Sequence, residues 1–149
     1  MTPDQSGTLV MHRSFAAPPE TVFRVLTSPD TLLDWWGPEG TRIAENALDF
    51  SRPGPWHATM VSPGGEAARV LGEVLEVDPP SSVRLTLAFD MGDGRRGPTS
   101  TIHFSLAATS DGTDLTLTQT GLDPAHIEDM RLKGWASALD RLTRLIATR

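Results

Sequence analysis

Residues 124–147 read PAHIEDMRLKGWASALDRLTRLIA, and this stretch decides the fold. Its apolar residues recur every three or four positions, which places them on one face of a helix. They are Ile127, Met130, Gly134, Trp135, Ala138, Leu139, Leu142, Leu145 and Ile146. Asp123 can cap such a helix, and Pro124 suits its first position. A helix of about 24 residues spans ~36 Å, which is enough to cross a whole sheet.

A glycine at position 134 interrupts this helical pattern. Glycine inside a helix costs about 1 kcal/mol relative to alanine. We therefore expect another element to approach the helix closely at Gly134.

The residues before this helix predict an antiparallel sheet. Turns rich in glycine and proline separate short apolar runs, and three of the runs alternate apolar with polar residues. The expected strands are residues 8–16, 41–49, 56–61, 67–77, 82–90, 99–109 and 113–120. Alternation leaves one face of the sheet in water, so a helix must cover the other face. The expected fold is α+β, a seven-stranded antiparallel sheet wrapped around the long C-terminal helix.

Two short helices are predicted after the first strand, over residues 19–27 and 29–36. Ser28 can cap the second of these helices through its side chain. Trp35 and Trp36 follow each other at its end, where two adjacent side chains cannot point the same way. We expect Trp35 to lock the helix onto the core and Trp36 to face the mouth of a cavity.

The composition excludes several kinds of site. A chain of 149 residues is long enough to bury one core, so we expect a single domain over residues 1–149 with a flexible start at 1–7. The absence of cysteine excludes a disulfide framework, a thiolate catalyst and a sulfur-bound zinc. The four histidines lack any metal-binding spacing, so no metal and no cofactor is expected.

Charge and hydropathy restrict the partners. The chain has 13 basic and 19 acidic residues, which gives a net charge of −6. A protein with this charge has no broad positive surface potential to attract nucleic acid or an anionic membrane. No apolar run approaches the ~20 residues of a membrane span, so we expect a cytoplasmic protein. Residues 92–97 match G-x-G-x-x-G, but a strand rather than a helix is predicted after them, which argues against a dinucleotide site.

Motifs along nearly the whole chain resemble one family. The residues that carry the resemblance are Phe15-Ala16-Ala17-Pro18, Val22-Phe23, Thr27-Ser28-Pro29, Trp35-Trp36-Gly37-Pro38 and Gly134-Trp135 with Leu139 and Leu142. They are similar to the activator-of-heat-shock-protein-90-ATPase-like branch of the START/Bet v 1 (SRPBCC) superfamily. The resemblance implies a helix-grip fold with a cavity between sheet and helix. Ala58 stands where such chains often carry a bulky aromatic residue, so an inward Ala58 would enlarge that cavity.

The favoured function is non-covalent binding of a hydrophobic or aromatic small molecule in this cavity. Flat rings and apolar side chains would form its wall. The expected ligand-binding residues are Trp36, Met60, Leu85, Leu87, Phe104, Leu117, Trp135 and Leu139. The sequence leaves a homodimer open.

Two alternatives belong to other classes. One is an enzyme of the cyclase or dehydratase type, in which His57 or a buried glutamate moves a proton. The glutamates on the expected strands are Glu45, Glu73 and Glu76. The other is a co-regulator of a chaperone ATPase that acts through a surface patch. The resemblance implies a second domain in such activators, and we expect none within these 149 residues.

The orientation of two polar side chains decides between these hypotheses. The strand pattern favours Trp56, Ala58 and Met60 facing inward and His57 facing outward, because an unpaired polar group in an apolar cavity costs ~1–3 kcal/mol. Arg13 shares a strand face with apolar neighbours, so it either reaches the rim or meets an acid. That acid is either a ligand or a carboxylate of the protein.

Overall fold

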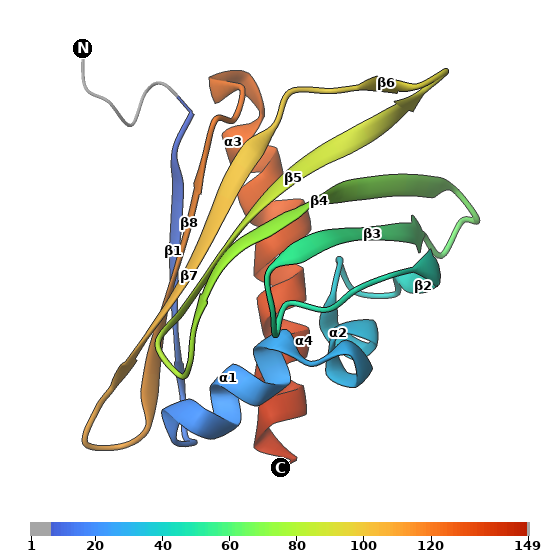
Figure 1. Ribbon diagram of the computed structural model, residues 1–149. Coiled ribbons are helices and arrows are strands. Elements are labelled where there is room, and N and C mark those ends of the chain that lie inside the picture. The colour runs from blue at the N-terminus through green and yellow to red at the C-terminus, as the bar shows by residue number, and fades with distance from the viewer. Residues whose placement is uncertain (1–6, 149) are drawn as a thin grey trace.

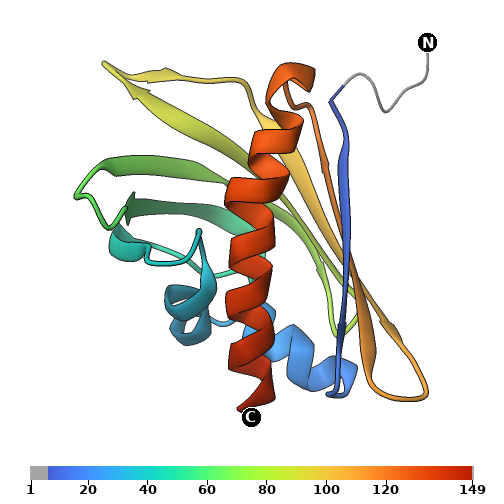
Figure 2. The ribbon, with the colours of Figure 1, turned by 180° about the vertical axis from the view of Figure 1, so that it is seen from behind.

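The structure is a computed structural model, described here for residues 7–148. A curved antiparallel sheet wraps around a long C-terminal helix, and two short helices lie at one end of the sheet (Figures 1 and 2). The helices after the first strand are α1 (Pro19–Thr27) and α2 (Pro29–Trp35). The strands are β1 (Leu9–Phe15), β2 (Arg42–Asn46), β3 (Gly54–Val61), β4 (Ala67–Asp78), β5 (Ser82–Gly92), β6 (Arg95–Arg96), β7 (Ser100–Ala108) and β8 (Thr113–Thr120). The predicted helix-grip architecture is confirmed.

The sheet order is β1-β8-β7-β5-β4-β3-β2, and every pair of neighbours is antiparallel. The short strand β6 pairs with the end of β5 and was not predicted. It lies within the G-x-G-x-x-G match, and strand β7 follows it. Along β7 and β8 buried residues alternate with less buried ones, so one face of these strands meets the core.

The C-terminal helical segment covers residues 124–147 as predicted, but it is not one uniform α-helix. It consists of a 3₁₀ turn η2 (Pro124–His126), α3 (Ile127–Asp129), a π-helix η3 (Met130–Trp135) and α4 (Ala136–Ala147). In an α-helix, Met130 and Trp135 would point about 140° apart. A π turn bonds residue i to residue i+5, which brings these two side chains nearer to one face.

The prediction that another element approaches Gly134 closely is wrong. Apart from the helix's own backbone, a Cβ at Gly134 would have only Met130 Cγ within 4 Å, at 3.8 Å. The close approach occurs instead at Gly72 on β4, where a Cβ would lie 1.8 Å from the Thr86 carbonyl oxygen of β5. Gly72 thus allows two strands to approach, whereas Gly134 borders open space.

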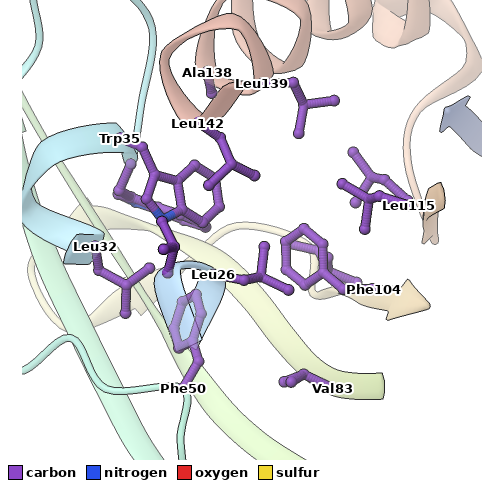
Figure 3. Close-up of a cluster of buried hydrophobic side chains, with 14 of the residues drawn as sticks. Leu26, Leu32, Trp35, Phe50, Val83, Phe104, Leu115, Ala138, Leu139 and Leu142 are labelled. Atoms are coloured by element: carbon purple, nitrogen blue, oxygen red, sulfur yellow. The ribbon is translucent and has the colours of Figure 1, made fainter. Parts of the chain in front are cut away.

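The core lies between the sheet and the C-terminal helix. Trp35 is fully buried and fixes α2 to the core, as predicted. Figure 3 shows its indole beside Leu142 and Ala138 of the helix, with Phe104 of the sheet nearby. The rings of Trp35 and Phe104 meet edge to face at 6.3 Å.

The two predicted caps differ in outcome. Asp123 accepts a hydrogen bond from the backbone N–H of Ala125 at 3.0 Å and caps η2 as predicted. Ser28 occupies the N-cap position of α2, but its side chain makes no cap hydrogen bond. Thr31 Oγ1 instead donates to the carbonyls of Val25 and Ser28, at 2.7 and 3.1 Å.

Residues 1–6, where the flexible start was expected, lie outside the described residues. Gly7 is buried, and its carbonyl accepts the N–H of Leu122 at 3.0 Å. Across residues 7–148 we find no helix with the length and apolarity that crossing a membrane requires.

Candidate functional site

A cavity of about 190 Å³ lies between the sheet and the first half of the C-terminal helical segment. The segments η3 and α4 form one side, strands of the sheet form the other, and the loop after α2 closes one end. Its wall consists of Trp36, Gly37, Pro38, Met60, Val70, Leu87, Phe89, Gln119, Met130, Gly134, Trp135 and Ala138. An engineered apolar cavity of about 150 Å³ binds benzene. This cavity therefore has room for a ligand of one or two rings.

A second hollow of about 270 Å³ adjoins the first. The two share Leu87, Phe89, Gln119 and Met130 as wall residues. Phe89 is 39% exposed, so the shared wall reaches the molecular surface. A longer ligand has space to extend from the cavity along this side.

A third hollow, of about 540 Å³, lies beside the turn at residues 47–55. Asp49 and Arg52 in its wall form an ion pair at 3.4 Å. No aromatic side chain lines it in the described part of the chain. The candidate site is therefore the cavity under the helix, where the aromatic rings gather.

All four tryptophans belong to one cluster of edge-to-face rings. The centroid of Trp36 lies 5.4 Å from Phe50, and 5.7, 5.6 and 5.8 Å from Trp35, Trp56 and Trp135. Each such pair contributes about 0.5–1.5 kcal/mol beyond the burial of its area. The packing holds the Trp36 and Trp135 rings in place before any ligand enters.

Gln119 is the one wall residue, within residues 7–148, whose side chain carries an amide. It is 1% exposed and lies on the inward face of β8. Its Oε1 accepts from Trp135 Nε1 at 2.7 Å, and its Nε2 donates to Ser100 Oγ at 2.8 Å. The Ser100 hydroxyl in turn donates to the Leu87 carbonyl at 3.3 Å. A chain of hydrogen bonds therefore links the helix, through the cavity wall, to strand β5.

Arg141 of α4 fixes the loop that closes the cavity. Its Nη1 donates to the carbonyls of Trp36, Gly37 and Pro38, at 3.2, 2.9 and 3.0 Å. Burial, and to a lesser extent the nearby Arg144, lower the pKa of Arg141, while Glu39 raises it. One guanidinium group thus donates to three successive carbonyls and holds in place the loop that closes one end of the cavity.

We expect Arg141→Met to lower the free energy of unfolding by about 2 kcal/mol, because the loop carbonyls lose a charged donor while the aliphatic stem remains. The matched control is Arg144→Met, which removes a surface ion pair with Glu39 and should cost under about 0.5 kcal/mol. Urea denaturation followed by tryptophan fluorescence measures both. Equal losses in the two variants would contradict the assigned role of Arg141.

The eight residues expected to bind ligand fall into two groups. Trp36, Met60, Leu87 and Trp135 line the cavity. Leu85, Phe104, Leu117 and Leu139 are fully buried in the packed core and line none of the three hollows. Trp36 faces the cavity as predicted, while Ala58 is fully buried and does not line the cavity.

His57 faces away from the cavity, as the strand pattern favoured. Its Nε2 lies 3.9 Å from the Glu45 carboxylate, and both side chains reach solvent. Arg13 meets an acid of the protein, Asp140 of α4, at 3.7 Å. Neither residue reaches the cavity wall.

The enzyme hypothesis needs an ionisable side chain in the cavity. No Asp, Glu, His, Lys or Arg among residues 7–148 lines the cavity itself, and the adjoining hollow is lined by Asp123 and His126. Glu45, Glu73 and Glu76 are exposed, so none is the buried glutamate of that hypothesis. Burial, followed by Arg84, lowers the pKa of His103, while Glu76 raises it. His103 lies on the outer face of β7, away from the cavity.

Sequence reasoning missed several wall residues. Gln119 continues the alternation of Leu115 and Leu117, so a polar side chain at that inward register was a readable signal. Met130 and Gly134 stood in the helical stripe, but the sequence did not distinguish them from core positions. The loop residues 37–38 gave no signal of this kind.

The comparisons with known proteins agree with this architecture. The family model described as Activator of Hsp90 ATPase homolog 1-like protein matches residues 16–147. No curated protein matches the chain.

Solved structures resemble the chain over almost its full length. The crystal structure of the AHSA1 protein from Silicibacter pomeroyi has a TM-score of 0.88 and 35% identity, covering 95% of this chain and 98% of that one. A protein from Chromobacterium violaceum has a TM-score of 0.83 and 29% identity, covering 94% and 97%. A protein from Nitrosomonas europaea has a TM-score of 0.77 and 26% identity, covering 96% of each chain.

Proposed function

This chain belongs to the Activator of Hsp90 ATPase homolog 1-like family, and on that basis we propose that it binds a small hydrophobic or aromatic molecule in the cavity beside η3. Its fold commonly binds hydrophobic ligands. The observation that carries the proposal is the apolar cavity of about 190 Å³ walled by Trp36 and Trp135. Pockets of this kind, apolar with few polar groups, are typical of small-molecule sites.

Three features of the wall support binding. The rings of Trp36 and Trp135 are held edge to face at 5.8 Å, so the site needs little ordering when a ligand enters. Met60 and Met130 supply flexible side chains that adapt to a ligand's shape. Gly134 leaves open space where any other residue would place a side chain.

The test uses tetralin, a hydrocarbon of two fused rings, as the probe. We expect it to bind the wild-type protein with a stoichiometry of one in isothermal titration calorimetry. Binding should also change the tryptophan fluorescence, because Trp36 and Trp135 form part of the wall.

Gly134→Leu should weaken tetralin binding at least about tenfold, which corresponds to about 1.4 kcal/mol, because the new side chain occupies the cavity. Leucine is a better helix former than glycine, so the variant should keep or raise its melting temperature. Lys133→Leu adds the same side chain one residue earlier, on an exposed position, and should leave binding unchanged. Equal tetralin affinity in wild type and Gly134→Leu would place the probe outside the cavity and refute the proposal.

A further inference from the structure

Two residues that line the cavity, Trp36 and Gln119, each carry a side-chain N–H for which residues 7–148 supply no acceptor. Trp36 is 4% exposed, and its indole Nε1 is buried without a hydrogen-bond partner among the described residues. Trp56 Nε1 donates to the Thr86 carbonyl at 3.1 Å and Trp135 Nε1 donates to Gln119, whereas Trp35 Nε1, in the core outside the wall, also lacks a partner among the described residues. Trp36 therefore stands out as a wall residue with an unused donor.

Gln119 supplies the second unused donor. A glutamine side chain has two N–H donors and an oxygen that accepts two hydrogen bonds. Trp135 Nε1 can only donate, so it requires the amide oxygen on its side. Ser100 gives its hydroxyl proton to the Leu87 carbonyl, so its oxygen accepts from Gln119 Nε2 on the other side. This arrangement fixes the orientation of the amide and leaves one N–H and one lone pair of Gln119 unused.

Unused donors in an apolar wall favour a particular kind of ligand. A buried N–H without an acceptor is costly, and a bound oxygen that accepts from it removes that cost. No charged side chain of the described residues lines the cavity, so an ionised ligand would be desolvated without a counter-charge. The wall thus favours a neutral molecule that brings an acceptor.

We propose that the natural ligand of this cavity is a neutral aromatic or alicyclic molecule that carries a carbonyl or hydroxyl oxygen, and that this oxygen accepts a hydrogen bond from Gln119 Nε2. Trp36 Nε1 is itself buried beneath the wall, so Gln119 Nε2 is the donor that this proposal assigns to the ligand. This inference rests on the proposed function, and it adds the chemical class of the ligand and the residue that selects it. Gln119 acts here as the specificity-determining residue of the site.

The test compares two probes that differ at one position, 1-tetralone, which carries a ketone oxygen, and tetralin, which lacks it. Transfer from water to an apolar site disfavours the ketone unless its lost hydrogen bonds are replaced. We expect wild type to bind 1-tetralone at least as tightly as tetralin. Gln119→Met, a substitution of similar length, should weaken 1-tetralone about five- to tenfold and change tetralin affinity by less than about twofold.

Thr118→Met is the matched control, because Thr118 neighbours Gln119 on β8 but faces the outer side of the sheet. It should leave the affinity of both probes unchanged. The proposal is overturned if wild type prefers tetralin, or if Gln119→Met keeps the same ratio of 1-tetralone to tetralin affinity.

A second measurement avoids dependence on the variant's folding. In ¹⁵N-labelled wild type, 1-tetralone should shift the side-chain amide resonance of Gln119 downfield, whereas tetralin should not. Unshifted Gln119 resonances at saturating 1-tetralone would refute the inference while tetralin binding still supports the proposed function. Failure of tetralin itself to bind refutes the proposed function, and the inference with it.

Discussion

Trp35→Ala should lower the free energy of unfolding by about 4 kcal/mol, since truncating a buried aromatic residue costs about 3–5 kcal/mol. Trp35 is fully buried, and its ring meets Trp36 and Phe104 edge to face at 5.7 and 6.3 Å. Leu142 of the C-terminal helix lies beside the Trp35 ring (Figure 3). Urea denaturation monitored by far-ultraviolet circular dichroism measures the loss.

Two further variants test whether the loss of stability in Trp35→Ala comes from lost packing of the ring. Leu33→Ala on the same helix removes a side chain that is 42% exposed and should cost under about 1 kcal/mol. Trp35→Phe keeps a ring and removes an indole N–H that has no hydrogen-bond partner in the described residues, so it should cost far less than alanine. If Trp35→Ala were no more destabilising than Leu33→Ala, Trp35 would not anchor α2.

Gly72→Ala should lower the free energy of unfolding by about 3 kcal/mol, at the upper end of overpacking effects. A Cβ there would lie 1.8 Å from the Thr86 carbonyl oxygen and 2.9 Å from Trp56 Nε1. The first contact is with backbone that is part of the sheet, so β4 and β5 would have to move apart. That movement would also strain the hydrogen bond from Trp56 to Thr86.

The control for this prediction is Gly64→Ala, in the turn between β3 and β4. A Cβ at Gly64 would meet only Ser62 Oγ, at 3.9 Å, so its effect should lie within about 0.5 kcal/mol. The midpoint of urea denaturation and the near-ultraviolet circular dichroism of the tryptophans report on both variants. Indistinguishable midpoints would show that the two strands tolerate a side chain at position 72.

Most of the fold could be read from local patterns. The stripe of apolar residues from Ile127 to Ile146 predicted the long helix, and alternation along β7 and β8 predicted which side of the sheet it covers. These patterns are strong because burial of one face is repeated at every turn or every second residue. The π-helix was not predicted, because the sequence around Met130 also fits an ordinary α-helix.

The candidate site was less predictable than the fold. Leu87 on β5 faces inward as Leu85 does, yet Leu87 lines the cavity while Leu85 is packed in the core. Inward register is a property of one strand, but a void depends on the distance between two elements. Where the helix approaches the sheet closely, inward side chains from both elements interdigitate and form the core. Where the helix lies farther from the sheet, the inward side chains line the cavity.

The sequence alone determined the order of the elements, the burial of their faces and the inward direction of Trp36 and Trp135, because each depends on spacing along one segment. Tertiary structure decided where the helix and sheet separate and which polar groups meet there. The π turn, the loop fixed by Arg141 and the open space at Gly134 together leave the void. The hydrogen bonds of Gln119 depend on β8, β7 and η3 converging, and contacts between distant segments leave no local signal in the sequence.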